Sequence, residues 1–294
     1  MTQCPDYARL FISARPFMLF CVGILIFGTE FCFGIFGRDG FTFSPIYDMF
    51  EATDVFVHVS RSLACELFIG DLSFDSTVRV LTDEEPRSSL ARLLTRYPSA
   101  VVSSGSDEPR EWCTIGSPIR TSLSFLGGAT NVWRVKEYVI GYNKLPCLCG
   151  NMIMKTAWRS SARSSESDIY LSIEKPNPRG LAEFECGGDV RFPGLAGFPI
   201  TVRNLRGDIY HTLRDDLDQP TPVLHRVVLR TVGCPLWDYS SDHDLLTSFR
   251  DALEGQCLLI PPEIFEPSRY SARRAPSNPQ CRLLYLGALF LCYA

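Results

Sequence analysis

The residues best suited to chemistry lie in Ser240-Ser241-Asp242-His243-Asp244, where two carboxylates flank one of only four histidines. Such a group could bind a metal ion or act as an acid and base pair. The same residues also fit the start of a helix, because Ser and Asp side chains accept hydrogen bonds from the free amides of a first turn. We therefore expect helix capping at this segment.

A zinc site is the second chemical candidate. Cys147 and Cys149 are the closest cysteine pair among twelve, and His211 or His225 could join them. No second pair, however, completes a tetrahedral set. The irregular cysteine spacing and the absence of any Asn-x-Ser/Thr acceptor favour reduced thiols and disfavour a secreted glycoprotein. We predict no metal ion and no cofactor.

Two further patterns contain parts of nucleotide sites. The stretch LGGA at 126–129 lacks the spaced glycines and the lysine of a phosphate cradle, so we expect a turn between strands. The stretch GDIY at 207–210 offers an Asp and a Tyr, but a helical pattern follows, which favours Asp208 as an N-cap. Arg273 and Arg274 fit a solvated basic loop. The sequence thus predicts no catalytic, cofactor-binding or metal-binding residue.

Composition narrows the class of protein. The 294 residues are 46% hydrophobic and 21% charged, which is typical of a folded globular chain and not of a disordered one. A net charge of -4 gives no reason to expect nucleic acid as the main ligand, because such binding needs clustered Lys and Arg. Nucleic acid is therefore not an expected partner.

The stretch RPFMLFCVGILIFGTEFCFGIFG at 15–37 is the least polar part of the chain. Its uninterrupted apolar run, 17–27, is shorter than the roughly 20 residues of a membrane helix, and no small residues suited to signal cleavage follow it. Aromatic and β-branched residues separated by Gly-Thr predict two buried strands. The apolar segment 281–294 is also too short to span, so we expect a core strand there and no membrane association.

Period-two and helical patterns along the rest of the chain predict a mainly β fold with a few short helices. We expect strands at 41–43, 54–60, 64–70, 119–126, 131–142, 169–173, 198–203, 224–232 and 256–265. We expect helices at 82–97, at 208–217 and at 241–255, the last with Ser241 as N-cap and Gly255 at its end. Polar, Pro-rich composition predicts a first β lobe at 1–156, a connection at 157–185 and a second β lobe at 186–294.

Six stretches occur in an order that resembles the gammaherpesvirus dUTPase-related proteins, the leftward-frame lytic proteins of Epstein-Barr virus and their rhadinovirus counterparts. They are FMLFCVGILIFGTE (17–30), FSPIYDMFEATDVFVHVSRSLACELFI (43–69), VWRVKEYVIGYNKLPCL (132–148), LAGFPIT (195–201), QPTPVLHRVVLRTVGCP (219–235) and LLIPPEIFEPSRYSARRAPS (258–277). The resemblance implies dUTPase-like β lobes in a shortened member, N-terminally and C-terminally incomplete. It also implies that the stretch at 17–30 lies inside the protein.

The resemblance implies a non-catalytic herpesviral protein, because neither the water-activating Asp nor the Gly-rich closing motif of dUTPases can be carried over. It further implies binding to host or viral proteins in the cytoplasm or nucleus of the infected cell, with interferon antagonism or control of lytic gene expression as the outcome. Two alternatives remain open at this point. One is an active dUTP pyrophosphatase that uses Asp208, and the other is a signal-bearing or membrane-anchored viral protein.

Overall fold

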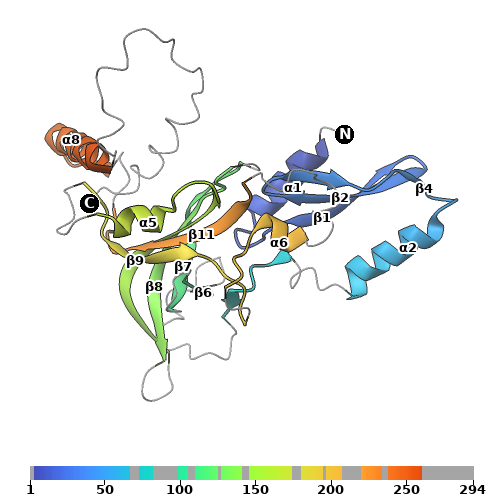
Figure 1. The fold of residues 1–294 in the computed structure, drawn as a ribbon, viewed down its shortest axis with the longest axis horizontal. Coiled ribbons are helices and arrows are strands. Elements are labelled where there is room, and N and C mark those ends of the chain that lie inside the picture. Colours follow the sequence, from blue (N-terminus) through green and yellow to red (C-terminus); the bar gives the residue numbers. More distant parts are fainter. Residues whose placement is uncertain are drawn as a thin grey trace, which may run out of the picture.

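A computed structural model describes residues 3–66, 73–81, 99–104, 110–124, 127–140, 146–173, 180–194, 197–206, 220–233 and 238–259. It confirms a mainly β fold with a few short helices, built around two antiparallel sheets (Figure 1). The predicted division into lobes at 157–185 stays a prediction, and strands from both sides of it, β9 and β11, pair within one sheet.

The N-terminal sheet lies beside helix α1. Its elements are α1 (Gln3–Ser13), β1 (Cys21–Phe27), β2 (Glu30–Gly37), β3 (Gly40–Phe43), β4 (Tyr47–Asp48) and α2 (Thr53–Arg61), with a π-helical turn at Ser62–Glu66. The predicted pair of strands in the opening apolar stretch is confirmed, because β1 and β2 form a hairpin. Gly28 supplies the left-handed φ of 64° that its turn requires. None of the helices described here is long and apolar enough to cross a membrane.

The larger sheet has seven strands in the order β10-β11-β9-β8-β7-β6-β5. Their bounds are β5 (Val78–Val80), β6 (Ala100–Ser103), β7 (Glu111–Thr121), β8 (Asn131–Ile140), β9 (Pro146–Ser160), β10 (Phe184–Asp189) and β11 (Pro222–Leu229). The remaining helices are α5 (Glu166–Leu171), α6 (Val202–Arg206) and α8 (Asp242–Leu259). The strands predicted at 131–142 and 224–232 are confirmed as β8 and β11.

One face of the large sheet packs against the segment that joins α1 to β1. Phe17 stacks on Trp133 of β8 with ring centroids 5.3 Å apart, and Leu19 belongs to a core cluster with Trp158 of β9. The amide of Leu19 donates to the carbonyl of Ser73 at 2.7 Å. We call this side the core face. The other side, on which α5 lies, we call the helix face.

Three predicted strands are wrong. Residues 54–60 lie in helix α2, because Val55 and Val59 satisfy a helical i, i+4 spacing as well as a period of two. The segment 169–173 lies largely in α5, where a capped turn precedes it. In 198–203 only single bridges form, at Pro199 and at Thr201, before α6 begins.

The helix predicted at 241–255 is confirmed as α8. The Asp244 amide donates to Ser241 Oγ at 3.2 Å, so Ser241 is the predicted N-cap. The helix continues past Gly255 to Leu259, so the predicted C-terminal end and the first residues of the predicted strand 256–265 are wrong. The strand predicted at 64–70 is wrong where it is described, because residues 64–66 belong to the π-helical turn. The rest of that segment, the predicted helices at 82–97 and 208–217, and everything predicted beyond residue 259 lie outside the described residues.

Candidate functional site

Strand β9 carries two cations on the helix face of the large sheet. Side chains alternate along a strand, and Met154 and Trp158 are buried on the core face. Lys155, Ala157 and Arg159 are therefore on the helix face, where they are partly exposed. Four residues of a strand span about 13 Å, so the two cations act on separate parts of helix α5 and its leading loop.

Lys155 forms an ion pair with Glu166, the first residue of α5. Its Nζ lies 2.6 Å from Glu166 Oε2, and the two side chains are 15% and 26% exposed. The pair is thus not sealed from solvent. Further along α5, Tyr170 stacks on Phe184 of β10 and packs against the cluster that contains Val227, which lies opposite Lys155 on β11. These apolar contacts hold the helix against the sheet.

The start of α5 is fixed by a capping box. Ser165 Oγ accepts the Asp168 amide at 3.0 Å, and the Asp168 carboxylate accepts the Ser165 amide at 3.2 Å. The hydrogen bonds with Ser165 lower the pKa of Asp168. Ser165 Oγ also lies 2.9 Å from Ser167 Oγ. A helix of six residues has little stability of its own, so this cap decides where the helix begins.

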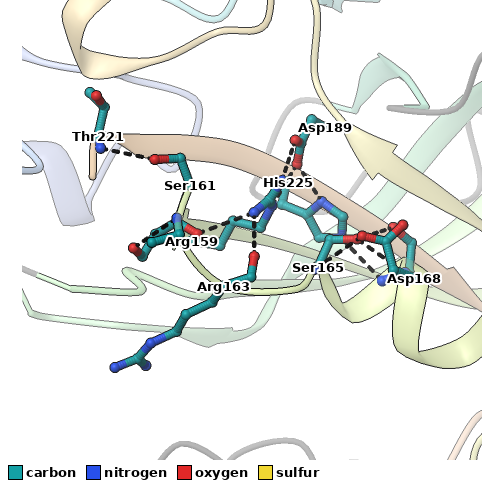
Figure 2. Close-up of polar contacts among 11 residues, drawn as sticks. Arg159, Ser161, Arg163, Ser165, Asp168, Asp189, Thr221 and His225 are labelled. Atoms are coloured by element: carbon teal, nitrogen blue, oxygen red, sulfur yellow. Dashed lines mark hydrogen bonds and ion pairs between the residues drawn. The ribbon is translucent and has the colours of Figure 1, made fainter. Parts of the chain in front are cut away.

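Asp189, at the end of β10, joins Arg159 to His225 of β11 (Figure 2). Its Oδ1 accepts Arg159 Nε at 2.8 Å and lies 2.9 Å from His225 Nδ1, and its Oδ2 accepts a second bond from Arg159. Burial alone raises the pKa of Asp189, but the hydrogen bonds from His225 and Arg159 outweigh it and lower the pKa to about 2. The carboxylate is therefore ionised at neutral pH.

The Asp189, His225 and serine side chains do not form a nucleophilic triad. His225 is only 4% exposed, and its Nε2 accepts the backbone amide of Ser167 at 3.4 Å. Ser165 and Ser167 are buried as well. A substrate carbonyl has no access to such hydroxyls, and a nucleophilic Ser needs its own oxygen bonded to the imidazole. The cluster is suited to holding α5 and its leading loop in place.

The residues that the sequence singled out near α8 lie apart from this site. His243 is 88% exposed and its Nδ1 is 3.9 Å from Asp244. Hydrogen bonds from Ser240 and Ser241 lower the pKa of Asp244, as expected for the start of a helix. Cys149 is exposed on β9, and among the described residues no three His, Cys, Asp or Glu side chains form a possible metal group.

The predicted turn in the LGGA stretch is confirmed where it is described. Gly127 has a φ of 88° and lies between β7 and β8. The Gly128 carbonyl accepts the amide of Trp158 at 2.7 Å, which ties the end of this turn to β9. Asp208, Tyr210, His211, Arg273 and Arg274 lie outside the described residues.

Sequence reasoning missed Lys155, Glu166 and Asp189. One local signal was available, since the spacing Ser-x-x-Asp at 165–168 is the capping-box pattern and marks a helix start directly before the segment predicted as a strand. The sequence contains no local pattern that predicts the pairing of Lys155 with Glu166. This pairing depends on how α5 packs back against the strand that precedes it, β9. His225 was considered only as a zinc ligand with Cys147 and Cys149, and it contacts Asp189 and Ser167 instead.

Comparison with known proteins changes the functional assignment. A sequence model of the fungal protein kinase family matches residues 1–263. No curated protein and no solved structure gives a significant match. The match contradicts the resemblance to gammaherpesvirus dUTPase-related proteins, whose stretches were loose patterns of apolar, Pro and Gly positions that β proteins of many families share.

The functional predictions that rested on this resemblance are wrong as well. They are the non-catalytic herpesviral role, the interferon and lytic functions, and the alternatives of a dUTP pyrophosphatase and a membrane-anchored viral protein. The prediction that the chain is not an enzyme is also wrong, because the matched family is one of enzymes. The predicted protein partners and cellular location stay predictions that have lost this support. The match extends over most of the chain, which belongs to the fungal protein kinase family.

Proposed function

We propose that the seven-stranded sheet with α5 is the nucleotide-binding part of a protein kinase, in which Lys155 binds the α- and β-phosphates of ATP. In protein kinases a Lys on a central strand contacts these phosphates, and a Glu on the following helix pairs with that Lys. The observation that supports the proposal is the 2.6 Å ion pair between Lys155 and Glu166. Both residues come from the elements that this role requires, a strand and the helix that follows it.

The sequence around the pair matches this role in part. In Met-Ile-Met-Lys at 152–155 only the Lys is identical to the Val-Ala-Ile-Lys pattern of kinases, and the apolar Met152, Ile153 and Met154 replace Val, Ala and Ile. Val132 lies opposite Lys155 on β8, and we compare it with the Val that ends the kinase Gly-rich loop. Counting back from Val132, Gly127 is at the second glycine of that loop, whereas Phe125 and Thr130 occupy the other two glycine positions. The loop therefore departs from the usual pattern.

The ion pair can position phosphate without doing covalent chemistry. The Lys155 ammonium can donate to two phosphate oxygens, while Glu166 keeps its side chain from folding toward other acceptors. His-Arg-Asp and Asp-Phe-Gly, which supply the base and a metal ligand in kinases, do not occur in the 294 residues. We therefore assign neither of these roles to a residue, and the proposal concerns nucleotide binding and phosphate positioning.

The test is a titration of the full chain with ATP and Mg²⁺. Binding is measured by calorimetry or by competition with a fluorescent ATP analogue. We expect Lys155→Met to weaken ATP binding by about tenfold or more, because hydrogen bonds to a charged partner are worth about 1.5–3 kcal/mol. Glu166→Gln is expected to weaken binding less, since it leaves the ammonium in place.

Lys136→Met is the matched control. Lys136 lies on the neighbouring strand β8, about four residues from Val132, which is opposite Lys155. The Lys136→Met substitution therefore removes the same kind of charge at a position away from the proposed phosphate contact. Its ATP affinity should equal that of the unaltered chain. Equal affinities for Lys155→Met and Lys136→Met, or no ATP binding by the unaltered chain, would contradict the proposed function.

A further inference from the structure

We propose that Asp189 is a positioning residue, which through His225 and Arg159 holds α5 where Glu166 can pair with Lys155. This inference rests on the proposed function, because the positioned pair is the one assigned to phosphate binding. Neither Asp189 nor its two partners contacts the Lys155 ammonium in the structure. They act on the loop and the helix that carry Glu166.

The first contact is with the helix itself. The Ser167 amide, adjacent to Glu166, donates to His225 Nε2 at 3.4 Å. Because Nε2 accepts this bond, the hydrogen of the ring is on Nδ1, which donates to Asp189 Oδ1 at 2.9 Å. Asp189 therefore selects the form of His225 that can accept an amide from the first turn of α5. An amide at this point has no partner inside the helix.

The second contact is with the loop before the helix. Arg159 Nη1 donates to the carbonyls of Ser160 at 3.1 Å and Arg163 at 2.8 Å, and Figure 2 shows the guanidinium between this loop and Asp189. The carboxylate of Asp189 receives two bonds from the same guanidinium, which fixes its plane. Arg159 can therefore reach the loop carbonyls only in the orientation that Asp189 imposes.

One carboxylate thus fixes both ends of the segment that separates the strand from Glu166. Six residues lie between Ser160, the last residue of β9, and the helix residue Ser167. A connection of this length could lead the short α5 to several positions over the sheet, and the apolar contacts of Tyr170 act on its far end only. We infer that loss of the Asp189 charge leaves α5 packed but lets its first turn move away from Lys155.

Hydrogen exchange tests this movement without reference to nucleotide. In the full chain, Asp189→Asn puts an NH2 donor in place of one of the carboxylate oxygens that accept from Arg159 and His225, and it removes the charge. It should increase the exchange rate of amides at 165–168 by about tenfold, because the contacts that hold the first turn are weakened, while amides of β9 and β8 change little. Asp75→Asn is the matched control, since Asp75 is at least as buried and bonds Arg226 of the same strand β11, but on the core face. Because Asp75→Asn leaves Arg226 buried without its partner, it is expected to destabilise the whole chain. The exchange at 165–168 is therefore compared with that of β8 and β9 in the same protein, and this ratio should be unchanged in Asp75→Asn.

ATP affinity gives the second measurement. We expect Asp189→Asn to weaken ATP binding by about tenfold, since small displacements of a positioning group have effects of this order, and Asp75→Asn to leave it unchanged in the folded protein. His225→Gln, which keeps an acceptor for the Ser167 amide, should retain more affinity than His225→Leu. A purely structural role would make the two His225 variants equal in affinity at equal fraction folded.

The outcomes separate the two proposals. Unchanged exchange at 165–168 in Asp189→Asn, or the same change in Asp75→Asn, overturns the positioning role. Faster exchange confined to Asp189→Asn in a chain that binds no ATP supports the positioning of α5 and contradicts the proposed function alone. Faster exchange together with normal ATP affinity overturns the inference that this positioning serves the Lys155 pair.

Discussion

His225 and Arg226 are neighbours on β11, and their side chains point to opposite faces of the same sheet, where each meets an Asp. On the core face, Arg226 is fully buried and donates to Asp75, to Thr77 Oγ1 at 2.6 Å and to the Ser103 carbonyl at 2.8 Å. On the helix face, His225 meets Asp189, whose side chain remains 26% exposed.

The difference between the two faces separates charged groups that only stabilise the fold from charged groups that position the proposed nucleotide site. The side chains of the core-face pair are 2% exposed or less, so this pair is closed off from solvent and holds the segment before β5 against β11. The helix-face groups lead, through a loop and a short helix, to the Lys155 and Glu166 pair that solvent still reaches. Two ion pairs of similar chemistry thus have different consequences, because solvent is excluded from Asp75 and Arg226 but still reaches Lys155 and Glu166.

The largest expected effect comes from breaking the core-face pair. Arg226→Met should lower the free energy of unfolding by about 3–5 kcal/mol, because it leaves the Asp75 carboxylate buried without a cation. Urea denaturation of the full chain measures this loss. The double variant Asp75→Asn with Arg226→Met should recover a large part of it, since no buried charge remains. A double variant as unstable as Arg226→Met alone would show that the two charges are not coupled.

This core-face pair also shows where sequence reasoning ends. The apolar, β-branched residues in 224–232 correctly predict the strand β11. It cannot predict that Arg226 is fully buried, because the partner Asp75 lies 151 residues away in the chain. A cation in a strand pattern normally indicates a solvent-facing position, and only the tertiary structure supplies the carboxylate that reverses this expectation.

The helix face was predicted less well for a different reason. The strand β8 and the helix α8 follow from strong periodicity, and both are confirmed. The α5 segment is short and rich in β-branched and aromatic residues, so its local preference favours a strand. Its capping box and its contacts with β10 and β11 override that preference. The candidate site therefore depends on α5, whose local sequence pattern predicts the wrong secondary structure.

The second prediction concerns the pH dependence of the helix-face cluster. The pKa of Asp189 is about 2 when folded, below the value of about 3.9 expected in the unfolded chain. A depressed pKa contributes stability above the unfolded value, and this contribution is lost as pH falls toward the folded value. It amounts to about 2 kcal/mol at neutral pH, once screening by the solvent that still reaches this side chain is taken into account.

Asp189→Asn should therefore be less stable than the unaltered chain near neutral pH, and the difference should shrink between about pH 4 and about pH 2. Urea denaturation at a series of pH values measures it. Asp168 and Glu185 also have lowered pKa values, but they are present in both proteins and their effects cancel in the comparison. A difference that stays constant down to the acid limit would contradict the assigned hydrogen bonds of Asp189.

The smallest expected effect compares the caps of two helices. Ser165→Ala removes the acceptor for the Asp168 amide in a buried cap and should cost about 1–2 kcal/mol. Ser241→Ala removes the matching bond at the exposed start of α8, where water can replace it, and should cost about 0.5 kcal/mol. Urea denaturation of both variants measures the two losses. Equal losses would show that burial does not strengthen the α5 cap. A larger loss for Ser165→Ala, together with weaker ATP binding than in Ser241→Ala, would place the start of α5 among the features that align Glu166 with Lys155.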